Sequence, residues 1–154
     1  MGSDTKPAVD GSAELAFAWR EGASRLAHLY QHDPLRVLFP LSPAGEPPEA
    51  ALITTSGGLV GGDRLTIAVE ARDNAACTVV AQAAEKVYRS LGADVAVSVR
   101  LTACPGAWLE WLPQETILFD GARLRRATLI ERSPGATVLA GEMLVLGRTA
   151  RGER

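Results

Sequence analysis

The chain has 154 residues, of which 47% are hydrophobic and 22% charged, as in a soluble single-domain protein with a substantial core. Its net charge of -2 argues against a nucleic-acid-binding protein with a basic face, and two cysteines without a CxxC pair argue against a disulfide scaffold or a structural zinc site. No apolar run approaches the ~20 residues of a membrane span, so we do not expect a membrane protein.

The N-terminal segment MGSDTKPAVDGSAE has no apolar core and no signal-peptide profile. We expect residues 1–13 to form a disordered leader and residues 14–154 to form one β-rich domain. A cytoplasmic location follows from the missing signal.

Beyond the leader, hydrophobic residues alternate with small or polar ones, which is the pattern of half-buried β-strands. Turn-forming clusters rich in Gly, Pro, Asn and Asp separate these segments at short intervals. The alternating residues are Leu15, Phe17 and Trp19; Leu65, Ile67 and Val69; and Val95, Val97, Val99 and Leu101. Many short strands with frequent turns predict an all-β domain.

Two segments differ from this pattern. Residues 81–89, AQAAEKVYR, are rich in the helix formers Ala, Glu and Lys and predict about two helical turns. Residues 40–49, PLSPAGEPPE, predict a proline-rich loop. The expected fold is therefore mainly β with one or two short helices.

A weak internal repeat indicates how the strands are arranged. Three apolar strands each follow a turn and open with an alanine, at Ala76, Ala107 and Ala136, with spacings of 31 and 29 residues. Near-constant spacing predicts a β-helix-like solenoid of stacked coils. The alternative is that the similar spacing has no structural meaning, because any all-β protein with regular turns shows such similarities. The last coil, which ends EMLVLGRTARGER, has no strand to cap it, so we expect the chain to be truncated at its C-terminus.

The glycine-rich segment GGLVGGD, residues 57–63, lacks the Lys-Ser/Thr of a P-loop and precedes a strand instead of a helix. A tight corner that needs positive φ or close backbone contact is the better interpretation. In such a corner we expect Asp63 to bond the turn amides.

Other reactive residues form no recognisable catalytic or metal motif. His28 and His32 lie in HLYQH, which lacks the glutamate of the HExxH metalloprotease pattern. Ser56 is not in a GxSxG elbow, and Cys77 and Cys104 lie in apolar strand contexts as small core residues.

Carboxylates are the remaining candidates for chemistry. Glu115 and Asp120 flank TILF and would lie at opposite ends of one short strand, whereas Glu110 is expected to be solvated. Glu142 aligns roughly with Glu115 when both are counted from their Pro-Gly-Ala turns. A row of carboxylates suits a hard cation or a partner protein; the alternative is a set of unrelated surface acids.

Several motifs in order carry a family resemblance. They are TTSGGLVGGDRL at 54–65, QAAEKVYRS at 82–90, WLPQETILFDGARLRR at 111–126 and LVLGRTARGE at 144–153, with PLRVLFP at 34–40. Together they resemble the UreD (UreH) family of urease accessory proteins, from about residue 15 to the end of the chain. Family members are longer, and this chain stops at about their midpoint. The fold that the resemblance implies is a β-rich, helix-like stack of strands.

The resemblance further implies a non-enzymatic maturation factor that joins the accessory proteins UreF and UreG on the apo-urease subunits. There it would help deliver nickel, which passes through the protein without becoming a tightly bound cofactor. Asp63, Glu115, Asp120 and Glu142 fall in or beside the matching motifs, so the resemblance makes them candidates for a nickel route or a partner interface. It implies no catalytic residue.

Two other functions remain open from the residues alone. One is a β-helical carbohydrate-active enzyme that uses paired carboxylates as acid and base, although only 5% of the residues are aromatic. The other is a purely structural protein-binding module.

Overall fold

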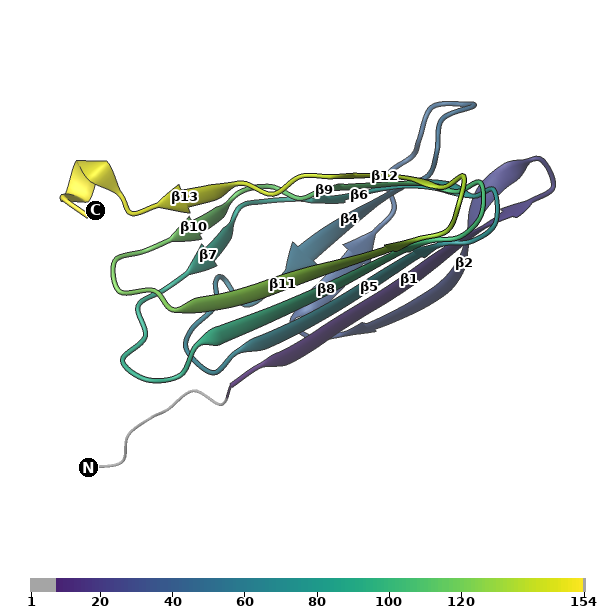
Figure 1. The fold of residues 1–154 in the computed structure, drawn as a ribbon. Helices are drawn as coiled ribbons and strands as arrows, with labels where there is room; N and C mark the ends of the chain where they lie inside the picture. Colours follow the sequence, from purple (N-terminus) through teal and green to yellow (C-terminus); the bar gives the residue numbers. More distant parts are fainter. Residues whose placement is uncertain (1–7, 154) are drawn as a thin grey trace.

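The computed structural model describes residues 8–153, and nearly all regular structure in this range is β-strand (Figure 1). One 3₁₀ turn, η1 (Thr149–Arg151), follows the last strand. The strands are β1 (Asp10–Arg20), β2 (Ala23–His32), β3 (Leu35–Leu38), β4 (Glu49–Thr54), β5 (Arg64–Ala71), β6 (Ala76–Ala81), β7 (Glu85–Val87), β8 (Val95–Ala103), β9 (Trp108–Leu112), β10 (Thr116–Leu118), β11 (Leu124–Arg132), β12 (Thr137–Ala140) and β13 (Leu144–Leu146).

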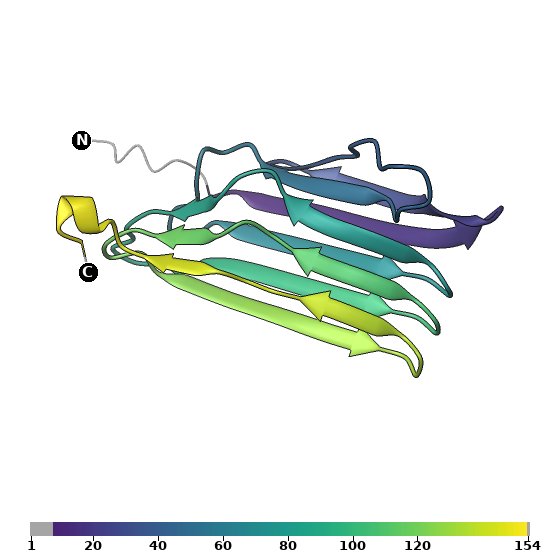
Figure 2. The same ribbon diagram turned by 90° about the horizontal axis from the view of Figure 1, so that it is seen from above.

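The strands form three sheets in two layers. Sheet A has the order β11-β8-β5-β1-β2 and makes one layer, the lower one in Figure 1. Sheet B, with the order β12-β9-β6-β4-β3, and sheet C, with the order β13-β10-β7, together make the other layer. Figure 2 shows strands of successive coils lying side by side in chain order.

Each coil contributes one strand to each sheet in turn. The complete coils are β5–β6–β7, β8–β9–β10 and β11–β12–β13, and equivalent strands of successive coils pair in parallel. Strands β1 and β4 open the stack in the same way, because they pair in parallel with β5 and β6. The predictions of an all-β fold and of a solenoid stack are confirmed.

Apolar rows from successive coils form the core between the layers. In sheet A, β5 places Leu65, Ile67 and Val69 beside Val97, Val99 and Leu101 of β8. All of these side chains are 6% exposed or less. Burial of each such side chain contributes about 1.5–3 kcal/mol, so every added coil strengthens the core by extending it with another row.

The corners that join the two layers repeat with the coils. The equivalent alanines are Ala75, Ala107 and Ala136, all buried. The residues before them, Asn74, Gly106 and Gly135, have φ values of 59°, 70° and 77°. This left-handed conformation favours glycine, and asparagine tolerates it. The repeat is therefore real, but its first copy begins at Ala75, so the predicted start at Ala76 was one residue off.

The predicted helix at 81–89 is wrong. Strand β6 runs to Ala81, and β7 (Glu85–Val87) pairs in parallel with β10. Pairing with the neighbouring coil supplies backbone hydrogen bonds that the local preference for helix cannot outweigh. Within residues 8–153 the single helical element is η1. No helix in this range is long and apolar enough to cross a membrane.

The two ends of the stack differ. At the first end, β2 and β3 pair antiparallel with β1 and β4 and so cover the edges of the opening coil. At the other end β11, β12 and β13 are edge strands, and no further strand within residues 8–153 pairs with them. Strand β1 begins at Asp10, ahead of the predicted domain start at residue 14, while residues 1–7 of the predicted leader lie outside the described range.

Candidate functional site

A cavity of about 370 Å³ lies between the two layers. Its apolar walls come from successive strands of the stack: Leu35, Leu52, Leu65, Ile67, Val97 and Trp111. The cavity therefore runs along the stack, from the opening coil toward the last one. Its volume is far above what a single buried water molecule needs.

Three polar side chains follow one another along this cavity, and we call them the polar track: Thr54 on β4, Glu85 on β7 and Thr116 on β10. Thr54 Oγ1 donates a hydrogen bond of 2.5 Å to Glu85 Oε2. Glu85 and Thr116 are neighbours in sheet C, and Thr116 is 5% exposed. Each of the three residues comes from a different coil, so the track is built by the same stacking that builds the core.

Burial dominates the electrostatics of Glu85. It raises the pKa of this carboxyl group above its usual value, because the charged form loses water. The hydrogen bond from Thr54, a backbone hydrogen bond from Lys86 and the positive charge of Arg126 act in the opposite direction but do not cancel the rise.

Arg126 and Glu142 form an ion pair where the cavity reaches the last coil. Arg126 on β11 lines the cavity, and its Nη2 lies 3.1 Å from Glu142 Oε1. Thr128 Oγ1 donates to the same carboxylate oxygen at 2.8 Å, and Trp111 Nε1 lies 3.4 Å away. Burial raises the pKa of Glu142, but the bond from Thr128 and the charge and bonds of Arg126 outweigh it, so the net pKa is lowered. Glu142 is therefore a carboxylate at neutral pH.

Asp63, the first of the predicted site residues, is fully buried in the glycine-rich corner. Its Oδ1 accepts from the Val9 amide at 3.0 Å and its Oδ2 from the Val60 amide at 2.9 Å. Gly58 in this corner has a φ of 132°, and a side chain there would collide with Tyr88. The predicted tight corner, with Asp63 bonding turn amides, is confirmed.

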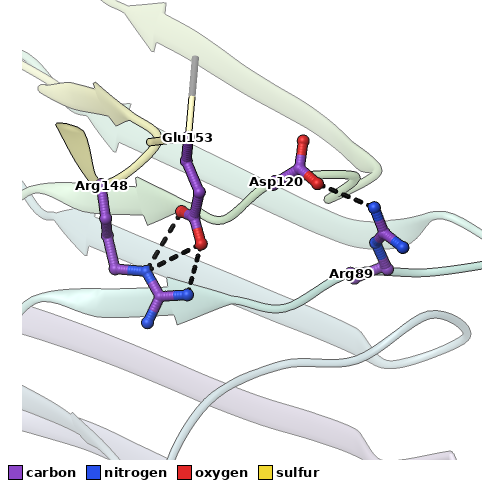
Figure 3. A network of polar contacts seen from close by, with 4 residues as sticks. All are labelled: Arg89, Asp120, Arg148 and Glu153. Atoms are coloured by element: carbon purple, nitrogen blue, oxygen red, sulfur yellow. Dashed lines mark hydrogen bonds and ion pairs between the residues drawn. The ribbon is translucent and has the colours of Figure 1, made fainter. Parts of the chain in front are cut away.

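Glu115 and Asp120 flank β10 as predicted, but neither lines the cavity. Asp120 Oδ2 lies 2.7 Å from Arg89 Nη2 at an exposed corner, beside the pair formed by Arg148 and Glu153 (Figure 3). Glu115 contributes its backbone carbonyl, which accepts from the amide of Glu85 at 2.9 Å. Asp120 is thus exposed, and Glu115 is partly buried outside the cavity lining.

The four predicted acids do not form one cluster. Glu115 and Glu142 come from neighbouring coils one residue out of register, because the amide of Thr116 bonds to the carbonyl of Met143. Within residues 8–153 no hydrogen bond or ion pair joins any two of the four. In the same range, no group of three or more His, Cys, Asp or Glu side chains is arranged to hold a metal ion. Glu142 is the member of the set that is linked to the cavity, through its ion pair with Arg126, which lines it.

The remaining candidates lie outside this site. His28 and His32 are exposed on β2, where His28 lies 3.4 Å from Glu14. Cys77 is a buried core residue as predicted, and burial together with the charge of Glu110 raises its pKa to about 12. Cys104 is half-buried in the turn after β8 and not in a strand.

Sequence reasoning missed Thr54, Glu85 and Arg126. Glu85 was hidden inside the predicted helix, and β7 has only 3 residues, too few for an alternating pattern. Arg126 could have been found, because it is in phase with Leu124 and Ile130 in the segment LRRATLIER. An arginine in phase with apolar residues indicates a charged group on the inner face of a strand.

Comparison with known proteins gives a consistent result. The family model described as "UreD urease accessory protein" matches residues 9–154. The protein named urease accessory protein UreD from Magnetococcus marinus is 53% identical over 152 residues, which cover 99% of this chain and 53% of that protein. Urease accessory protein UreD 1 from Brucella anthropi is 44% identical over 146 residues, covering 95% of this chain and 51% of that protein.

The chain spans about half the length of the curated relatives it matches. The family match nevertheless extends over almost the whole chain and includes every strand of the stack. The chain belongs to the UreD family of urease accessory proteins.

Proposed function

We propose that this chain acts in urease maturation as a non-enzymatic scaffold on the apo-urease subunits, together with the accessory proteins UreF and UreG, and that it helps deliver nickel to the urease active site. Family membership supports the link to urease, since the relatives carry the name urease accessory protein. The observation that carries the delivery role is the cavity with its polar track, which crosses successive coils of the stack.

The polar track suits a cation in transit. Its hydroxyl and carboxyl groups are oxygen ligands, which divalent cations accept without the tight thiolate or imidazole bonding of a storage site. Thr54 and Glu85 form the first position at which the cation would bind, and Thr116 is the next residue along the track. Nickel is the cargo on this route, and the apolar walls would limit the number of places where it can pause.

We further propose different roles for the four acids indicated by the sequence. Glu142 belongs to the route, since its carboxylate pairs with Arg126, which lines the cavity in the last coil. Glu115 and Asp120 belong to a partner interface on the surface. Asp63 supports the route indirectly by fixing the corner in which both its oxygens bond backbone amides.

The test is nickel loading of urease in cells that supply its subunits and the other accessory proteins but no UreD-type protein. With this chain co-expressed, the nickel content and activity of purified urease should rise. Glu85→Gln and Glu142→Gln should reduce the nickel content several-fold. The matched control is Glu131→Gln, which changes an exposed carboxylate on the outer face of sheet A and should have no effect. Equal nickel content with and without the chain would contradict the proposal.

A further inference from the structure

The outer faces of the two layers differ in how their charges are arranged. On the outer face of sheet A, carboxylates lie beside basic side chains of neighbouring strands. The pairs are Asp10 with Arg64 (3.4 Å), Glu14 with His28 (3.4 Å) and Glu131 with Arg100 (2.8 Å). The carboxylates of these pairs are therefore matched by basic side chains on the same face.

The outer face of sheet B carries an apolar row instead. In register across the sheet lie Leu38, Ala51, Val80 and Leu112. Their inward-facing neighbours, such as Leu52 and Trp111, are buried, so alternation turns this row outward. Leu38 is 53% exposed and Leu112 is 38% exposed, whereas the small side chain of Ala51 is 8% exposed.

Two carboxylates lie in the adjacent row of the same face. Glu49, Thr78 and Glu110 are aligned across β4, β6 and β9, and Leu139 of β12 continues the row. Glu110 accepts hydrogen bonds from Thr78 Oγ1 at 3.0 Å and from Trp108 Nε1 at 2.9 Å. Within residues 8–153 neither Glu49 nor Glu110 has a basic side chain within ion-pair distance, unlike the acids that face outward from sheet A.

We infer that the outer face of sheet B is a docking surface for a partner protein that presents an apolar strip flanked by Arg or Lys side chains. An interface with an apolar centre gains from burying Leu38, Leu112 and Leu139, and basic groups would complement the two carboxylates. Face-to-face packing of a second copy would instead bring rows of carboxylates together. The partner is therefore a different protein.

The size of the face fits this role. Five strands about 4.8 Å apart and about five residues long cover on the order of 400 Å², roughly half of what one partner buries in a standard interface. Sheet B thus supplies the centre of an interface whose rim comes from neighbouring loops. Further coils added at the β12 edge would widen this face without covering it.

The identity of the partner rests on the proposed function, so the test uses the apo-urease subunits and accessory proteins co-expressed with the tagged chain. Leu139→Asp on sheet B is compared with Leu129→Asp on the outer face of sheet A. These residues are 49% and 48% exposed, and both lie on edge strands. Leu139→Asp should weaken co-purification at least tenfold, because an apolar contact is lost and a charged group would be buried in its place. Leu129→Asp should leave it unchanged.

A second variant tests the charges without disturbing the apolar row. Glu49→Gln with Glu110→Gln should weaken association several-fold and make it less sensitive to salt. Thermal unfolding of all variants confirms that each is folded. If the sheet A and sheet B variants weaken co-purification equally, or neither does, the inference is overturned while the proposed function stands. If the unaltered chain does not co-purify, both are overturned.

Discussion

Strands β8 and β11 occupy the same place in successive coils, yet they differ in almost every side chain. Both have 9 residues and pair along their whole length. On its inner face β8 carries Val97 and Val99, which are 6% and 1% exposed. At the paired positions β11 carries Arg126 and Thr128. Strand β8 has a neighbour on each side, whereas β11 has a neighbour on one side within the described residues.

The difference shows that the polarity of a strand's inner face depends on whether neighbouring strands cover it on both sides. A strand between two others can bury a wholly apolar row, because no water reaches it. At the last strand the core is open on one side, and the groups there bond each other: Arg126 and Thr128 both contact Glu142. Arg126 of this cluster lines the cavity, so the change from apolar to polar residues also marks the end of the proposed route.

The largest expected effect is on core packing. Leu101 of β8 is 0% exposed and pairs with Ile130 of β11, which is 45% exposed. Leu101→Ala should lower the free energy of unfolding by about 3 kcal/mol. Ile130→Ala should lower it by about 1 kcal/mol, because half of its side chain is already in water. Urea unfolding of the two variants measures the difference, and equal losses would mean that another strand covers β11.

The next effect concerns the polar cluster of the last coil. The side chains of Arg126 and Glu142 are 17% and 32% exposed, so their attraction is only partly screened. A double-mutant cycle with Arg126→Met and Glu142→Gln should give a coupling free energy of about 1–2 kcal/mol. Additive effects would show that the ion pair does not form in solution.

A smaller effect is expected on the pH dependence of stability. Because the pKa of Glu85 is raised in the folded state, the folded protein holds a proton that the unfolded chain has released. This group therefore favours folding most at low pH and loses its contribution as the pH rises above about 4.3, the usual value for glutamate. Glu85→Gln should raise stability at pH 8 relative to pH 5, compared with the unaltered chain. An identical pH profile for both would contradict burial of the carboxyl group.

The smallest effect is expected for the ion pair that joins β8 to β11 on the outer face. The side chains of Arg100 and Glu131 are 58% and 51% exposed. Their pairing is worth roughly 0.5 kcal/mol or less. Removing it with Arg100→Ala should change the urea midpoint only slightly, and less at high salt. A loss near that of Leu101→Ala would show that charges and not packing join the coils.

The stacking pattern was accessible from the sequence because it repeats. Pro-Gly precedes both Ala107 and Ala136, so two of the coils could be aligned directly. The first coil was displaced by one residue because Asn74 holds the left-handed position that glycine holds elsewhere. When a different residue type adopts the same backbone conformation, the copies of a repeat are harder to align by sequence.

The site was harder to predict because it depends on neighbouring coils. Thr54 meets Glu85 only when successive coils are in contact, and their separation of 31 residues is visible only once the register is known. The acids that stood out in the sequence, Glu115 and Asp120, do so because they flank a strand. That position leaves both outside the cavity lining, Glu115 partly buried and Asp120 exposed.

Amide hydrogen exchange at single-residue resolution tests the central contrast between the covered strand and the edge strand. The amide of Val95 bonds to Arg123 and that of Ser133 to Ala103, so the odd-numbered amides of β11 point toward β8 and the even-numbered ones point away. The structure predicts slow exchange at every residue of β8. Along β11 it predicts alternation, slow at Arg125, Ala127, Leu129 and Glu131 and fast at Arg126, Thr128, Ile130 and Arg132. Uniformly slow exchange along β11 would contradict an open last coil.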